Sequence, residues 1–407
     1  MQPIAMTDTP AHNRMSTAMV VLTLSMLLGL QPITTDLYLP ALPGLTQDLG
    51  ASMAQAQLTL SALLLAFGAS QLVWGPVSDR FGRRPVLLVG LLAYLVASIA
   101  CALVSTMEQL IYWRTLQGIA MGAAVMCARA IVRDLYAPAQ GATAMSKGLS
   151  GLGVLACIAA PLGGVLTALW GWHAALSALA AFGALALVLI ALRFEETVPQ
   201  KNPRALEWRT LLRTWLHILR NPEFVAFSAL SLCSYGGLFT FLAASSFVYI
   251  KVLGFTTTQY GLTMFLNSFI YLVGTFACRR MVRHLGVRRT VAWAGLASLA
   301  CGVGMPLLAW LGFRAGWAIM LPMSAFIFGH GIHQPCGQSG AVGPFPQAAG
   351  AASAMNGFLM MLAAFFTGQW LGTHMDGSVL PLAWGMGFWS VLLVLSAWTL
   401  VQRYGEN

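Results

Sequence analysis

Residues 75–85 read Gly-Pro-Val-Ser-Asp-Arg-Phe-Gly-Arg-Arg-Pro and join two long apolar segments. The stretch holds one acid, three arginines, two glycines and two prolines. Glycine and proline are typical of tight turns, and arginines gather in the loops on one side of a membrane. The stretch therefore predicts a basic turn between two membrane-spanning helices.

The composition also indicates a membrane protein. Of the 407 residues, 58% are hydrophobic and 8% are charged, whereas soluble domains carry about 25% charged residues. So few polar side chains cannot cover a surface in water, which excludes a large soluble enzyme. The net charge of +10 comes from short clusters between apolar runs. It therefore indicates loops beside anionic lipid and no nucleic-acid partner.

Twelve apolar runs are long enough to cross a bilayer, because a spanning helix needs about 20 residues. Only helices satisfy every backbone polar group of such a run in lipid. The sequence therefore predicts an all-α polytopic membrane protein with twelve transmembrane helices in two six-helix halves. The runs lie at about 17–42, 54–78, 85–105, 107–132, 144–168, 172–193, 222–250, 257–280, 288–312, 315–341, 347–371 and 380–402.

The lysines and arginines predict which helix ends face the cytoplasm. Eighteen of them lie on the side that holds residues 75–85, and only Lys251 and Arg314 lie in loops on the other side. Cytoplasmic loops carry the excess of positive charge, so both termini are expected in the cytoplasm.

The longest loop, 194–221, separates six spans from six. Its segment 207–220 brings tryptophans and leucines close together on one helical face, which predicts an amphipathic helix on the membrane surface. A solvated linker is the alternative. The predicted divisions are a cytoplasmic tail at 1–16, an N-terminal bundle at 17–193, the linker at 194–221, a C-terminal bundle at 222–402 and a tail at 403–407.

A shift of 204 residues relates the basic turns of the two halves. It places Gly82 on Gly286 and Arg84 on Arg288, while an arginine takes the place of Asp79. The second half thus keeps the basic turn and lacks its acid. Two related halves imply a central site at their interface.

Several motifs point to one family. Residues 75–85 resemble the first loop signature of the major facilitator superfamily. Residues 114–118, Arg-Thr-Leu-Gln-Gly, resemble its motif around a membrane-embedded arginine, and 160–164, Ala-Pro-Leu-Gly-Gly, resemble the motif of its antiporter branch. With 36–43, 133–136 and 350–354, they resemble the Bcr/CflA group of bicyclomycin and chloramphenicol resistance exporters. Residues 195–197, Glu-Glu-Thr, depart from the Pro-Glu-Thr often found there.

The resemblance implies the major facilitator fold and a drug:proton antiporter of a bacterial inner membrane. Its expected partners are a small-molecule drug, protons and the lipid bilayer, and a monomer is expected. The resemblance implies no cofactor, because the proton gradient drives transport, and we expect no metal site.

A proton-driven exporter needs a titratable group in its core, and of the twelve acids only Asp36 lies well inside a span. Burial disfavours the charged form of a carboxylate and a nearby cation favours it. Asp36 and Arg114 both lie roughly 10 Å from the outer boundary at about 1.5 Å per residue. We therefore predict that Asp36 and Arg114 couple proton movement, directly or through water. A structural ion pair, or an Arg114 satisfied by backbone carbonyls, is the alternative.

The basic turn is predicted to act as a conformational latch at the cytoplasmic mouth. Arg129 lies about 22 Å beyond Arg114 along the same helix, and we expect it to join Asp79 and Asp134 there. Positive-inside anchoring is the alternative. The predicted latch residues are Gly75, Asp79, Arg80, Gly82, Arg83, Arg84, Arg129, Arg133 and Asp134.

The span at 144–168 combines small residues with a proline, which permits close helix contact and a kink. This suits a helix that moves against its neighbours, although simple tight packing explains it equally. The predicted antiporter-motif residues are Gly153, Pro161, Gly163 and Gly164.

Aromatic residues with a few polar partners predict a site for a partly apolar drug, although interfacial aromatics also anchor membrane proteins. Two histidines three residues apart share a face of the span at 315–341. A second protonation site, a metal pair or ordinary packing would each explain them, and no further metal ligands lie nearby. The predicted pocket residues are Tyr38, Gln117, Tyr235, Phe239, Asn267, His330 and His333.

The expected function is proton-coupled export of a small amphipathic antibiotic by alternating access. Export of an endogenous metabolite, such as an amino acid or a siderophore, is the alternative on the same scaffold. The glycine-proline pattern of 144–168 disfavours an uptake symporter. A membrane enzyme is disfavoured because no nucleophile, metal cluster or paired carboxylates are recognisable.

Overall fold

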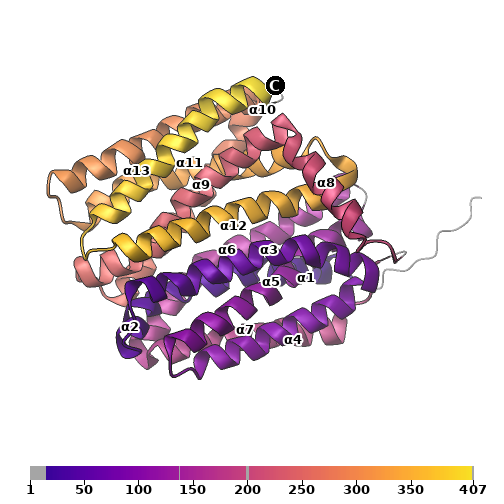
Figure 1. The fold of residues 1–407 in the computed structure, drawn as a ribbon, viewed down its shortest axis with the longest axis horizontal. Coiled ribbons are helices and arrows are strands. Elements are labelled where there is room, and N and C mark those ends of the chain that lie inside the picture. Colours follow the sequence, from indigo (N-terminus) through magenta and orange to yellow (C-terminus); the bar gives the residue numbers. More distant parts are fainter. Residues whose placement is uncertain (1–14, 137, 199–200, 406–407) are drawn as a thin grey trace, which may run out of the picture.

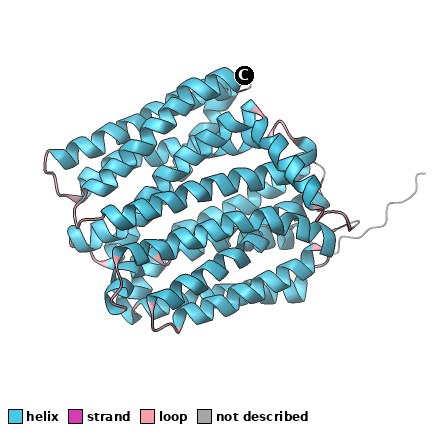
Figure 2. Cartoon of the chain, in the orientation of Figure 1, coloured by secondary structure: helices cyan, strands magenta, loops and turns pink. Residues whose placement is uncertain are grey.

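The computed structural model describes residues 15–136, 138–198 and 201–405, and within these ranges every regular element is a helix (Figure 2). Most of the predicted N-terminal tail and the last two residues lie outside the described residues. The first half comprises α1 (Thr17–Asp36), a 3-10 turn (Leu39–Ala41), α2 (Leu42–Asp48), α3 (Met53–Phe81), α4 (Arg83–Ala102), α5 (Met107–Leu135), α6 (Pro138–Trp170) and α7 (Trp172–Arg193). The remainder comprises α8 (Trp208–Arg220), α9 (Pro222–Phe247), α10 (Thr257–Trp310), α11 (Gly316–Val342), α12 (Ala349–His374), α13 (Leu380–Leu395) and α14 (Val401–Tyr404). Short π-helical segments lie at Val248–Val252 and Ser396–Leu400, and a short 3-10 helix lies at Pro346–Ala348.

The helices confirm the predicted twelve spans. Ten helices of the described chain are long and apolar enough to cross a membrane, and one of these, α10, holds two of the predicted spans. The remaining span is α11, which is 27 residues long but less apolar, because it carries two histidines and two glutamines.

The basic turn is tighter than the sequence predicts. We expect spans to end near 78 and to begin near 85, but α3 continues to Phe81 and α4 begins at Arg83. Gly82 alone makes the turn, with a φ of 108° that other residues rarely adopt. Gly286 breaks α10 in the same way, with a φ of 75°. The 204-residue shift thus relates two glycine turns of similar geometry.

The N-terminal capping of α3 recurs at the start of α10. Ser52 caps α3 and Thr256 caps α10, each in a capping box with a glutamine three residues later. In this arrangement two otherwise unpaired backbone N–H groups gain partners. The two boxes are separated by the same shift as the glycine turns, so the repeat extends over whole helices.

The two halves lie side by side, with α12 of the second half alongside α3 of the first (Figure 1). We call the end that holds Gly82 and Gly286 the basic end, and the other the opposite end. Helix α8 lies at the basic end with a strongly amphipathic sequence, where the sequence predicts such a helix. Its Ile218 is buried, while Trp208 and Leu216 are exposed.

Helices α3 and α12 run in opposite directions and pack closely along their length. Small residues allow this, because a glycine on one helix faces the partner helix at each contact. The paired positions are Ala54 with Gly372, Ser61 with Gly368, and Gly68 with Met361. This contact forms one of the two long seams between the halves; α6 and α10 form the other.

Candidate functional site

A cavity of about 550 Å³ lies between the two halves. Four helices of each half line it: α1, α3, α5 and α6, and α9, α10, α11 and α12. Toward the basic end it is bounded by the exposed residues Leu149 and Gln338. Its walls are mainly apolar with a few polar groups, as in sites for partly apolar small molecules.

The predicted antiporter motif closes the cavity at the opposite end. Gly163 lies directly against the carbonyl oxygen of Leu37, the residue that follows α1. A Cβ atom at Gly164 would lie only 2.6 Å from the carbonyl oxygen of Thr257 in α10. Helix α6 therefore contacts both neighbours at a distance that no larger residue allows.

The α6–α10 seam is looser nearer the basic end. A Cβ atom at Gly153 would lie 3.6 Å from Leu272 of α10, which is ordinary contact, and Gly153 itself lines the cavity. The motif thus has two structural settings: Pro161, Gly163 and Gly164 lie at the seal, and Gly153 lies at the cavity wall.

Hydrogen bonds between the halves reinforce the seal. The amide nitrogen of Gln57 donates to the carbonyl oxygen of Ala243 at 2.8 Å, and the Thr257 hydroxyl donates to the Gly164 carbonyl oxygen at 3.1 Å. The ammonium of Lys251 donates to the side-chain oxygen of Gln47 at 2.7 Å. The opposite end is therefore closed in this conformation.

Asp36 lies at the wall of this cavity, at the C-terminal end of α1. Its carboxylate accepts a hydrogen bond of 2.9 Å from the hydroxyl of Thr35. Within the described part of the chain it makes no ion pair, so its charge has no fixed counterion.

The direct Asp36–Arg114 contact that the sequence suggests is not formed. Arg114 is fully buried, and both of its terminal nitrogens donate to the carbonyl oxygen of Thr34 at 3.2 Å. One nitrogen also donates to Gln117 at 2.8 Å, and the guanidinium lies 4.3 Å from the ring centre of Tyr38. The last carbonyls of a helix lack backbone partners, and Arg114 supplies one for α1. This geometry agrees with the alternative prediction, in which a backbone carbonyl satisfies the hydrogen bonds of Arg114.

The predicted pocket residues divide between the cavity and the packed interior. Tyr235, Asn267 and His330 line the cavity. The others are absent from its wall because each faces a neighbouring helix: Tyr38 bonds Thr59, Gln117 bonds Ser98, Phe239 packs at Gly368, and His333 contacts the carbonyl oxygen of Val291. Helical spacing alone does not reveal which neighbour a residue faces.

His330 is held in a fixed orientation at the cavity wall. Its Nδ1 lies 2.8 Å from the hydroxyl of Ser234. Its ring stacks with Phe326 and lies 5.6 Å from the ring of Tyr271. His330 and His333 share a helix but differ in setting, and no cluster of three potential metal ligands occurs among the described residues.

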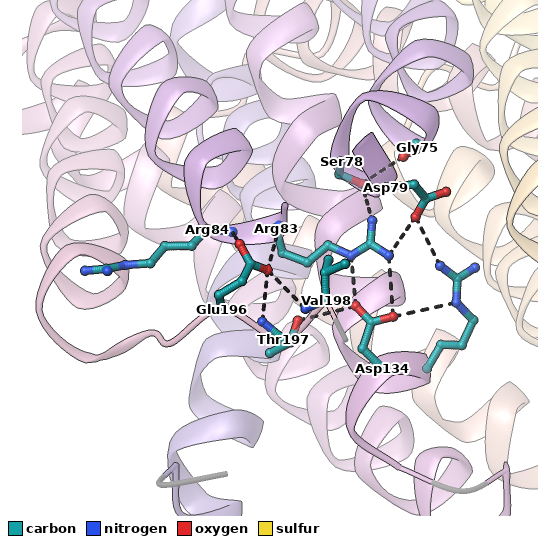
Figure 3. A network of polar contacts seen from close by, with 10 residues as sticks. Gly75, Ser78, Asp79, Arg83, Arg84, Asp134, Glu196, Thr197 and Val198 are labelled. Carbon is teal, nitrogen blue, oxygen red and sulfur yellow. Dashed lines mark hydrogen bonds and ion pairs between the residues drawn. The ribbon is translucent and has the colours of Figure 1, made fainter. Parts of the chain in front are cut away.

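The predicted latch is a network of charged groups at the basic end (Figure 3). Arg83 lies at its centre, 2.7 Å from Asp79 and 2.9 Å from Asp134. Arg133 completes it at 3.4 Å from Asp79 and 3.9 Å from Asp134. The network therefore joins α3, α4 and α5 of the first half.

Three of the predicted latch residues take peripheral places. Arg80 and Arg84 are exposed, and Arg84 donates to the carbonyl oxygen of Ala191 at 3.0 Å. The carbonyl oxygen of Gly75 accepts a hydrogen bond from Ser78 within α3. These residues flank the network and make no ion pair in the described structure.

Arg129 does not join Asp79 and Asp134 as the sequence predicts. Arg129 lies one helical turn before Arg133 in α5, nearer the membrane centre, and lines the cavity. Its guanidinium donates a hydrogen bond of 2.8 Å to the hydroxyl of Ser353 in α12. This bond crosses between the halves. Arg83, on the neighbouring helix, takes the place expected for Arg129 because its side chain points between Asp79 and Asp134 (Figure 3).

Sequence reasoning missed the role of Glu196. Its carboxylate accepts hydrogen bonds from the backbone N–H groups of Arg83 and Arg84, and thereby caps the start of α4 (Figure 3). It also accepts from Thr197 and Val198, while the Thr197 hydroxyl donates to Asp134. The Glu-Glu-Thr segment, noted only as a departure from the expected motif, thus ties the linker to the latch.

Comparison with known proteins identifies the family. A sequence profile described as Major Facilitator Superfamily matches residues 24–368. The chain belongs to the major facilitator superfamily. The bicyclomycin resistance protein homolog of Haemophilus influenzae is 27% identical over 395 residues, covering 96% of this chain and 98% of that protein. Multidrug resistance protein D of Escherichia coli is 30% identical over 346 residues, covering 85% and 86%.

The fold of this superfamily member also matches a solved structure. The crystal structure of a D-xylose-proton symporter superposes with a TM-score of 0.74 at 18% identity and covers 96% of this chain and 99% of that one. The likeness concerns the fold. This superfamily member is therefore a multi-pass membrane protein with a cavity of about 550 Å³ between its two halves.

Proposed function

We propose that this protein exports small amphipathic antibiotics, such as bicyclomycin-like or chloramphenicol-like compounds, in exchange for protons. The observation that carries the proposal is the cavity between the halves, closed at one end and bearing one carboxylate, Asp36. The names of the two relatives, one for bicyclomycin resistance and one for multidrug resistance, support a drug as the cargo. These names favour a drug over an endogenous metabolite as the cargo.

The orientation follows from charge. The loops at the basic end carry most of the lysines and arginines, and such loops remain in the cytoplasm. With the basic end inside, both termini are cytoplasmic and the cavity faces inward. A bacterial inner membrane and a monomeric state complete the proposal.

The cycle begins with drug entering from the cytoplasm while Asp36 is deprotonated. The halves then close at the basic end and separate at the α6 seal. Asp36 takes up a proton from the outer side as the drug leaves, and the protonated carboxyl returns inward. Because a buried carboxylate without a counterion is costly, neutralisation by a proton favours the return.

Arg114 acts in this scheme as a positioning residue. It fixes the carbonyl oxygen of Thr34, two residues before Asp36, and so holds the end of α1 in place. It does not touch the cavity. Proton transfer is therefore assigned to Asp36, with Arg114 setting its position through the backbone.

Purified protein in liposomes provides the test, with a pH gradient as the only driving force. Wild type should accumulate a drug such as chloramphenicol in the acidic compartment, and a protonophore should abolish this. Asp36→Asn should abolish uphill transport while still binding the drug. Asp376→Asn, at an exposed acid in the α12–α13 connection, should transport normally. Uphill transport by Asp36→Asn would refute the coupling assignment.

A further inference from the structure

Two buried amide side chains from different halves line the same part of the cavity wall. Gln71 of α3 and Asn356 of α12 both line the cavity, and each residue is only 2% exposed. The amide of Gln71 lies against α12 at Gly357, with its oxygen 3.5 Å from the position of a Cβ atom there. The two amides therefore lie where the α3–α12 seam meets the cavity.

Each amide presents an oxygen without a partner. The side-chain oxygens of Gln71 and Asn356 are buried and accept no hydrogen bond. Their nitrogens are engaged: Gln71 donates to the carbonyl oxygen of Phe67 at 3.4 Å, and Asn356 donates to the sulfur of Met360 at 3.8 Å.

The amides cannot be reversed without loss. A carbonyl oxygen and a thioether sulfur accept hydrogen bonds and have no hydrogen to donate in return. Turning either amide would place its oxygen against such an acceptor. Both free positions are therefore acceptors, and a buried acceptor without a partner is costly.

Building on the proposed function, we propose that Gln71 and Asn356 form a subsite for hydroxyl groups of the exported compound, which donate hydrogen bonds to the two free amide oxygens. The subsite selects donors because both of its free positions are acceptors. Asn267 on α10 also lines the cavity with an unpartnered buried oxygen. Asn267 extends the preference for hydrogen-bond donors to a second wall of the cavity.

The position of the subsite gives it a second property. Gln71 and Asn356 belong to different halves, so a compound that donates one hydroxyl to each oxygen contacts α3 and α12 at once. Separation of these helices removes one of the two contacts. The subsite therefore binds the donor most tightly in a conformation with the seam closed, as it is here.

The test pairs a change in the ligand with a change in the protein. Chloramphenicol carries two hydroxyl groups, and its di-O-methyl ether carries neither. Dissociation constants of both compounds are measured for the purified protein in detergent, using wild type, Gln71→Met and Asn356→Leu. The ratio of the two constants reports the hydroxyl preference and is insensitive to changes in the fraction of protein that is competent to bind.

Wild type should bind chloramphenicol about tenfold more tightly than the ether, because a site built to bond a hydroxyl rejects the analogue lacking it. Each variant should reduce the preference to less than about threefold, mainly by weaker binding of chloramphenicol. Ser390→Ala is the control. Ser390 lies on α13, is buried and also has an unpartnered oxygen, but it does not line the cavity.

The outcomes separate the inference from the proposed function. If wild type binds chloramphenicol and both variants keep the hydroxyl preference of wild type, the inference is overturned and the export function stands. Equal binding of the two compounds by wild type would do the same. A wild type that binds neither compound would overturn the proposed cargo and the subsite with it.

Discussion

The guanidinium of Arg129 donates a hydrogen bond of 2.8 Å to the hydroxyl of Ser353 and thereby joins α5 of the first half to α12 of the second. This bond lies toward the basic end, where the cavity extends, whereas the bonds of Gln57 and Thr257 cross the closed opposite end. The basic end therefore carries a polar contact that must break when the halves separate there.

Ser353→Ala should shift the protein toward a wider opening at the basic end. A hydrogen bond to a charged group contributes about 1.5–3 kcal/mol, so the open fraction should rise by about tenfold or more. Hydrogen exchange of the C-terminal turns of α5 and the N-terminal turns of α12 measures this change. Ser339→Ala is the control, because its hydroxyl bonds only within α11. Unchanged exchange in Ser353→Ala would show that the bond does not hold the halves.

Asp79→Asn should slow transport more than it weakens drug binding. Asp79 contacts Arg83 and Arg133 in the charged network at the basic end and does not line the cavity. We expect a loss of about tenfold or more in transport rate, with the dissociation constant of the drug within about twofold of wild type. Transport in liposomes and equilibrium binding measure the two quantities. A variant that lost binding but kept its turnover would contradict the latch role.

Gly163→Ala should destabilise the closed opposite end. A Cβ atom at Gly163 would overlap the carbonyl oxygen of Leu37, and overpacking of this kind costs about 1–3 kcal/mol. Thermal unfolding in detergent should show a lower midpoint for this variant. Gly44→Ala is the control, because nothing lies within 4 Å of its Cβ position. An equal midpoint for both variants would mean that α6 moves aside without loss.

Arg114→Lys should lower thermal stability while leaving the cavity intact. A lysine ammonium cannot reproduce both the double contact with Thr34 and the bond to Gln117. Loss of one hydrogen bond of a buried charged group costs about 1.5–3 kcal/mol, so the unfolding midpoint should fall by several degrees. Arg314→Lys, at an exposed arginine of the opposite end, is the control. Normal stability combined with an altered pH dependence of transport would favour a direct role in proton coupling.

Much of the architecture is legible in the chain. The apolar runs predict the helices, and the repeat of Gly82 at Gly286 predicts the break within α10, because only glycine readily adopts the required φ. The isolated acid Asp36 marks the cavity, because a carboxylate within a span rarely lies anywhere except near a polar interior.

The polar contacts between helices are less predictable. Arg83, Arg129 and Arg133 carry the same charge, and spacing along a helix does not state which acid each one meets. Gln71 and Asn356 look like ordinary polar residues within apolar spans. Their shared position emerges only when α3 and α12 are packed side by side.

The membrane class, the number of spans and the division into two halves can be read from the amino-acid sequence, because hydrophobic length and charge placement are properties of the chain. The packing of the helices is needed to place Arg114 as a cap of α1 beside Asp36, to put Arg83 in the latch position expected for Arg129, and to bring two unpartnered amide oxygens of different halves to the cavity wall. These relationships depend on the rotation and register of helices distant in the chain. Packing of small residues sets that register, through contacts as specific as Gly163 against Leu37.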